Sequence, residues 1–227
     1  MSKNISHWIK NVRVLFEHGL CGLPTKQSSI ATPGECTGNQ GLLGNLSLQY
    51  QVLVCCDKLL HDCTLLFRRA IGKRIIHEME KKEIIIDLAH ASPKLIEEVL
   101  EIAKRPVIVS HTGVNGIFDS PRNLSDTNLR AIAKNGGLIG IGFWEEAVGS
   151  IQPASIAAAI RYTSDLIGVD HVALGSDFDG AVTTSFDASN IILLTEALIQ
   201  EDFSDLEIKK IMGGNQIKFL RHNLPKK

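Results

Sequence analysis

The sequence predicts an α/β fold of the (β/α)8 barrel class, and three observations support this. From about residue 70 onward, short apolar segments typical of buried strands alternate with segments of helical periodicity, which indicates a parallel sheet with its helices outside. No GxGxxG or P-loop motif follows any of these segments, so a nucleotide-binding sheet is disfavoured. Residues able to carry chemistry follow successive strands, as they do at the active-site face of a barrel.

One strand–helix–strand unit organises this pattern. Strands are expected at 84–88 and 107–110, and each is followed closely by a histidine, His90 after the first and His111 after the second. Ser92 is placed to cap the helix between them. Because such a crossover makes the two strands parallel neighbours, their carboxyl ends, and with them both histidines, are expected at one edge of the sheet.

The rest of the chain continues the alternation. Helices are expected at 71–82, 125–134, 153–167, 188–200 and 205–220, and further strands at 138–143 and 171–175. Ser204 and Glu207 form a capping-box pattern before the last helix. Only four strands are clear in this pattern, so the barrel is expected to be incomplete, with an exposed parallel edge that favours association into oligomers.

Residues 1–68 follow a different pattern and are treated as an atypical segment, separate from the barrel portion at 69–227. All five cysteines fall in it, without the CxxC spacing of a zinc ribbon or a redox site. A small cluster of Cys56, His61 and Cys63 is an alternative candidate for a metal site. No sustained strand or helix period runs through this segment, so no chemistry is assigned to it.

Composition excludes several classes of partner. The net charge is −1, which gives no electrostatic basis for binding nucleic acid or an anionic membrane. No apolar run approaches the roughly 20 residues that span a bilayer, and the first residues lack the apolar core of a secretory signal. A cytoplasmic protein without a membrane segment is therefore expected.

The residues at the strand ends point to a metal-assisted reaction. Neutral imidazoles such as His90 and His111 suit zinc, and a carboxylate at Asp177, after the fourth strand, is placed to exchange protons with metal-bound water. A turn or helix-capping role is the alternative for Asp177. The planar fork of Arg122 can hold a carboxylate in two hydrogen bonds. Asp87, like Asp179, is expected to fix its loop through hydrogen bonds or to orient a neighbouring ligand.

These segments together resemble the membrane (renal) dipeptidase family of zinc metallopeptidases, whose fold is an amidohydrolase-type barrel. The matching segments occur in order from about Gly72 to the C-terminus, roughly two-thirds of the chain. They are IIDLAHAS (85–92), PVIVSH (106–111), PRNLSD (121–126), LGSDFDG (174–180) and GGN (213–215).

The resemblance implies a function and a role for each site residue. The family hydrolyses dipeptides, often with a D-residue on the C-terminal side, at a pair of zinc ions. His90 and His111 match the histidines that hold one zinc of the pair. Arg122 matches the arginine that grips the substrate carboxylate, and Asp177 matches the aspartate that serves proton transfer. A small dipeptide is thus the expected partner.

The chain also departs from the family pattern. The His-x-Asp pair that holds the other zinc occurs nowhere in the sequence, so at most one zinc is expected here. Glu17 and His18 are weakly matching candidates for the bridging glutamate and the substrate-binding histidine. A C-terminal half-barrel of a truncated dipeptidase, with negligible turnover, is therefore expected. A non-catalytic remnant and a single-metal amidohydrolase acting on another small amide are the alternatives.

Overall fold

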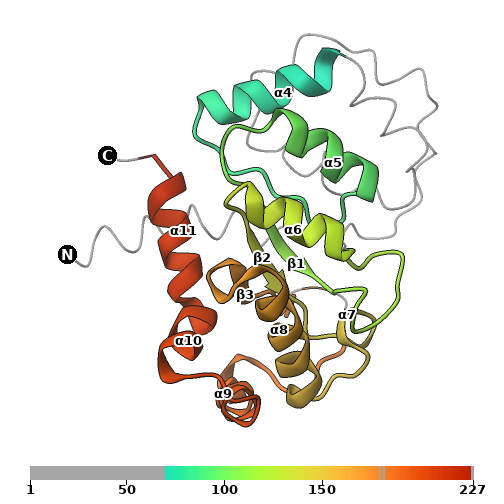
Figure 1. Cartoon of the computed structure of the whole chain (residues 1–227), viewed down its shortest axis with the longest axis vertical. Helices are drawn as coiled ribbons and strands as arrows, with labels where there is room; N and C mark the ends of the chain where they lie inside the picture. The colour runs from blue at the N-terminus through green and yellow to red at the C-terminus, as the bar shows by residue number, and fades with distance from the viewer. Residues whose placement is uncertain (1–69, 179, 181, 226–227) are drawn as a thin grey trace, which may run out of the picture.

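A computed structural model of the protein describes residues 70–178, 180 and 182–225 (Figure 1). Strands β1 (Ile108–Thr112), β2 (Leu138–Ile141) and β3 (Val172–Leu174) form a parallel sheet in the order β1-β2-β3. The α/β class and the parallel sheet are therefore confirmed. The division at residue 68 and the incomplete barrel stay predictions.

The strand expected at 84–88 is not found as a regular strand. This segment joins the sheet through one bridge, Asp87 to Ile108, with hydrogen bonds Leu88 N to Ile108 O (2.8 Å) and Ile108 N to Ile86 O (2.9 Å). The preceding helix shortens it, because the Ile84 amide still bonds back to a helix carbonyl, Met79 O, at 2.9 Å. Too few residues are left for a longer ladder.

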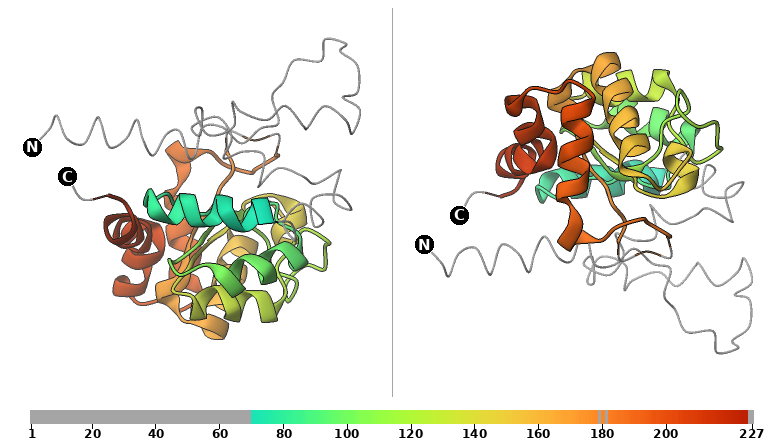
Figure 2. Two further views of the ribbon diagram at one scale, coloured as in Figure 1. Left: turned by 90° about the horizontal axis from the view of Figure 1, so that it is seen from above. Right: turned by 90° about the horizontal axis from the view of Figure 1, so that it is seen from below.

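The helices follow in chain order, and all but the last contribute side chains to the core on one face of the sheet. They are α4 (Ala70–Lys81), α5 (Pro93–Ile102), α6 (Asp126–Lys134), α7 (Glu145–Val148), α8 (Pro153–Ile167), α9 (Ile192–Gln200), α10 (Asp205–Lys209) and α11 (Asn215–Asn223). Each of α4, α5, α6, α8 and α9 packs against the next in that list (Figure 1). Figure 2 shows α10 and α11 together at one side of the molecule.

Helix ends follow the sequence closely. Ser92 Oγ accepts from Leu95 N (3.2 Å), and Ser204 forms the expected capping box. Some expected boundaries are wrong, and the strand expected at 138–143 already ends at Ile141. His171 lies in a 3-10 turn before β3, a 3-10 turn at Ala188–Asn190 precedes α9, and the helix expected at 205–220 is interrupted. The interruption is a π-turn in which Gly213 adopts φ 142°, a backbone conformation that favours glycine.

The face of the sheet opposite α4 to α10 changes character along the strands. Near the amino ends it is apolar: a buried layer takes one residue from each of the four aligned segments, packed with Phe219 of α11. This layer is made up of Ile85, Ile108, Leu138 and Ala173. Two residues further along each segment, the same face carries the small or polar residues Asp87, Ser110, Gly140 and Gly175. Bulky side chains therefore end where the carboxyl edge of the sheet begins.

Asn215, in the matching segment GGN, fixes the position of β3. Its side chain is buried, and its amide donates to Val169 O (2.7 Å) and Val172 O (2.8 Å). The next residue, Gln216, donates to Leu174 O at 3.0 Å. The segment thus holds the strand that leads to Asp177, and its role here is structural.

Replacing Asn215 by alanine is expected to destabilise the fold by about 1–3 kcal/mol, because the carbonyl groups of Val169 and Val172 lose their donor. The measurement is the urea unfolding free energy of Asn215→Ala beside Asn190→Ala, a control at an exposed position. Equal stability of the two variants would show that the Asn215 amide does not hold β3.

Candidate metal and substrate site

The ring nitrogens of His90 and His111 converge at the carboxyl edge of the sheet. Their Nε2 atoms are 2.9 Å apart, and the rings meet edge to face with centroids 4.8 Å apart. The sequence suggested that His111 follows its strand, but His111 lies inside β1. His90 adopts a left-handed backbone conformation with φ 62°, rare for a residue with a side chain.

Asp87 holds these two histidines together. Its Oδ1 atom accepts one hydrogen bond from Ala89 N and another from Ser110 N, each of 3.0 Å. One carboxylate oxygen thus joins the turn that carries His90 to the strand that carries His111. The loop-fixing role expected for Asp87 is found.

The two rings lie within hydrogen-bond distance of polar neighbours. Arg122 Nη2 is 3.1 Å from His90 Nε2, and because a guanidinium only donates, that nitrogen is the acceptor of this contact. His111 Nε2 lies 2.9 Å from the same atom, and His111 Nδ1 lies 3.0 Å from Ser110 Oγ, with donor and acceptor set by the tautomer of His111. A metal bound at His111 Nε2 would leave the ring proton on Nδ1. The Ser110 hydroxyl can accept that proton's hydrogen bond, so it satisfies either tautomer.

The histidine pair fits one zinc ion. Two nitrogen ligands on a tetrahedral zinc, each about 2.0–2.1 Å from the metal, lie about 3.3 Å apart, close to the 2.9 Å between the two Nε2 atoms. Within residues 70–178, 180 and 182–225, no group of three or more His, Cys, Asp or Glu side chains is placed to hold a metal ion. The pair would supply two of the ligands of such an ion.

Trp144, which the sequence analysis missed, lies beside the same group. The Arg122 Cζ atom is 4.7 Å from the centroid of its ring, and the His111 ring is 6.0 Å away. Asn123 fastens the loop of Arg122 to the same region, since its amide donates to Glu146 O at 3.0 Å. The one signal in the sequence was position: an aromatic residue follows β2, between β1, which carries His111, and β3, which leads to Asp177.

Asp177 lies on the loop beyond β3, at the same edge of the parallel sheet. Its backbone is also left-handed, with φ 56°, and its carbonyl accepts from Gly180 N at 2.9 Å. A Cβ atom at Gly180 would lie 2.6 Å from Asp177 Oδ1, so glycine makes room for the carboxylate. Phe178 packs edge to face on Phe143, with centroids 5.6 Å apart, which anchors the loop.

Several candidates lie outside the described residues. They are Glu17, His18, the cluster of Cys56, His61 and Cys63, and Asp179. The structure brings His90, His111 and Arg122 into direct contact and sets Asp177 at the same edge of the sheet, beyond β3, two strands from His111.

The comparisons with known proteins identify the family. The family model for membrane dipeptidase, Peptidase family M19, matches residues 69–225. The chain belongs to the membrane dipeptidase family. Dipeptidase verJ of Clonostachys rogersoniana is 34% identical over 154 residues, which are 66% of this chain and 40% of that protein. Dipeptidase ataJ of Aspergillus terreus is 32% identical over 169 residues, 71% of this chain and 39% of that one.

A solved structure shares the fold. It is a metallopeptidase from Rhodobacter sphaeroides liganded with a phosphinate mimic of the dipeptide L-Ala-D-Ala, with a TM-score of 0.65 and 24% identity, covering 68% of this chain and 47% of that chain. The chain spans about 40% of the length of the curated dipeptidases it matches. The predicted family is confirmed, and the relatives named here are dipeptidases and a metallopeptidase. Among the described helices, none combines the length and apolarity needed to cross a membrane.

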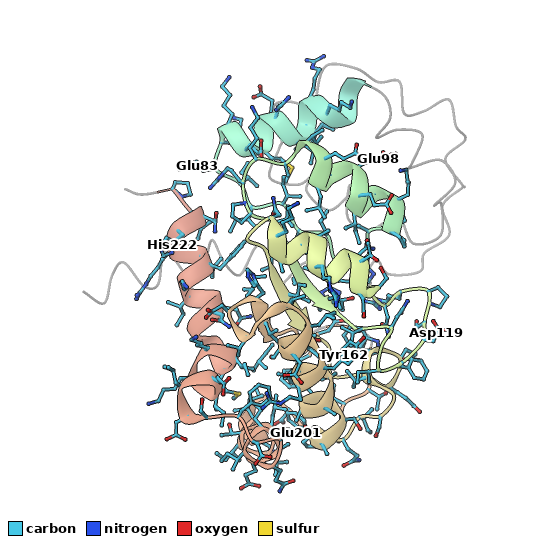
Figure 3. All side chains as sticks on the ribbon, viewed as in Figure 1. Glu83, Glu98, Asp119, Tyr162, Glu201 and His222 are labelled. Carbon is cyan, nitrogen blue, oxygen red and sulfur yellow. The ribbon has the colours of Figure 1, made fainter. Side chains whose placement is uncertain are left out.

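Replacing His90 by alanine is expected to weaken zinc binding at least tenfold, because one of the two converging nitrogen ligands is removed. Isothermal titration of zinc measures the affinity. His222→Ala is the matched control, since His222 is exposed on α11 (Figure 3). If His90→Ala and His222→Ala bind zinc as wild type does, the histidine pair is not the metal site.

Proposed function

We propose that the protein is a zinc-dependent dipeptidase acting on dipeptides with a free C-terminal carboxylate. The observation that carries this is the contact of the Arg122 guanidinium with His90 Nε2, 3.1 Å away. A metal-binding nitrogen and a carboxylate-binding cation are thus neighbours. In a dipeptide the scissile carbonyl and the terminal carboxylate are separated by one residue, about 3.5 Å of chain. A longer C-terminal segment would carry the carboxylate past Arg122.

Each residue has a role in this proposal. His90 and His111 hold a zinc ion, and the chemistry that such an ion supplies is polarisation of a carbonyl and activation of water. Arg122 binds and orients the substrate carboxylate through paired hydrogen bonds. Asp177 accepts a proton from the attacking water and passes it to the leaving amine. Trp144 lies against Arg122 and His111.

The relatives support the substrate class. The curated proteins that match residues of this chain are named dipeptidases, and the Rhodobacter structure holds a mimic of a dipeptide with a C-terminal D-residue. Because this chain spans about 40% of those curated proteins, the proposal places two zinc ligands, the carboxylate-binding arginine and the proton-transfer aspartate in the described part. Any further zinc ligands come from water or from outside it.

A change of Arg122 to lysine keeps the charge but loses the bidentate geometry. It is expected to lower kcat/KM for a dipeptide, which corresponds to a loss of about 1.5–3 kcal/mol of transition-state stabilisation. Arg130→Lys, at an exposed position on α6, is the control. Amidated dipeptides are expected to be poor substrates of the unaltered protein. If amidation leaves its rate unchanged, Arg122 does not bind the carboxylate.

The assay that tests the proposed function uses the purified 227-residue chain with zinc. Zinc-dependent hydrolysis of L-Ala-D-Ala that is lost in His90→Ala would support the proposed function and contradict the negligible turnover expected from the missing His-x-Asp pair. Absence of zinc-dependent hydrolysis of any dipeptide tried would contradict the proposal and favour the non-catalytic remnant. Hydrolysis of other small amides as fast as dipeptides would favour the single-metal amidohydrolase. The solution mass of the same sample tests the predicted oligomer.

A further inference from the structure

Trp144 is a buried aromatic ring in contact with two site residues. Its side chain is only 3% exposed. The guanidinium carbon of Arg122 lies 4.7 Å from the ring centroid, and the His111 ring meets the indole edge to face at 6.0 Å. An indole face attracts a guanidinium and stacks parallel to it with ease, so it limits the orientations that the cation can adopt.

The indole has its position because Gly142 has no side chain. A Cβ atom at Gly142 would overlap ring atoms Cζ3 and Cη2 of Trp144. The backbone at Gly142 cannot retreat, since its amide donates to Thr112 O of β1 at 2.8 Å. The ring therefore lies against the glycine backbone at the end of β2, and a methyl group at this position would displace it.

The backbone beside Arg122 is fastened to the same place. The Asn123 side chain is buried, and its amide donates to Phe118 O (2.7 Å), Glu146 O (3.0 Å) and Ala147 O (3.2 Å). The last two carbonyls belong to α7, the short helix that begins directly after Trp144. Two sets of contacts thus hold Arg122 against the segment that contains Trp144 and α7. One is made by the neighbouring residue Asn123, and the other by the guanidinium of Arg122 itself.

We infer that Trp144, placed by Gly142, is a positioning residue that orients Arg122 for a free C-terminal carboxylate and so determines the preference for dipeptides over their amides. This inference rests on the proposed function. A guanidinium binds a carboxylate through two parallel hydrogen bonds only when both groups lie nearly in one plane. Held on the indole, Arg122 keeps that plane before the substrate arrives, and less conformational entropy is lost on binding.

Kinetic measurements on L-Ala-D-Ala and its amide test the inference. Trp144→Leu and Gly142→Ala are each expected to raise KM for the free dipeptide about tenfold, with kcat changed less than threefold. Turnover of the amide is expected to stay as in wild type, because the amide makes no paired hydrogen bonds with Arg122. Trp144→Phe keeps an aromatic face and is expected to retain KM within about threefold.

A spectroscopic measurement separates this inference from the proposed function. The Arg122 Nε–H resonance, assigned by its loss in Arg122→Lys, is expected to show a ring-current shift that Trp144→Phe keeps and Trp144→Leu loses. If Trp144→Leu does not fold, Trp144→Met replaces it. A ring-current shift without dipeptide hydrolysis contradicts the proposed function alone. The positioning role is overturned if Gly142→Ala and the leucine or methionine variant both hydrolyse the dipeptide with the wild-type KM and both discriminate against the amide as wild type does.

Discussion

The site depends on the pair of hydrogen bonds that Asp87 Oδ1 accepts from Ala89 N and Ser110 N. The segment 84–88 joins β1 through a short ladder, so backbone pairing alone leaves the turn beyond it weakly located. The carboxylate adds a charge-assisted link across the two strand ends, where the ladder has finished. His90 and His111 can then meet, although they belong to different segments of the chain.

Two site residues hold conformations that proteins usually reserve for glycine. His90 and Asp177 have φ angles of 62° and 56°. Such conformations cost about 1–3 kcal/mol each and persist where the surroundings determine them. At His90 the fixed neighbour is Ala89, bound by Asp87, and at Asp177 it is Gly180, whose amide bonds back to the aspartate carbonyl. Each turn leads its side chain off the end of a strand, at the edge where the parallel sheet gathers the site.

Local patterns predicted most of this architecture. Ser92 and Ser204 cap helices as expected, because a capping bond needs only residues three apart. The strand–helix–strand unit predicted that His90 and His111 meet, since the crossover leaves few alternatives. Trp144 was missed because its importance lies in contacts with Arg122 and His111, which no periodic pattern encodes. The shortened segment 84–88 was also missed, since the extra bond from Ile84 to α4 leaves no mark in the sequence.

The central claim is that His90 and His111 together bind zinc at this edge. X-ray absorption at the zinc edge, on the 227-residue protein with one equivalent of zinc, tests it most directly. The account predicts at least two imidazole nitrogens at about 2.0–2.1 Å from the metal, with one imidazole fewer in His111→Ala. Sulfur neighbours at about 2.3 Å, which would implicate the cluster at Cys56 and Cys63, or a spectrum unchanged in His111→Ala, would contradict it.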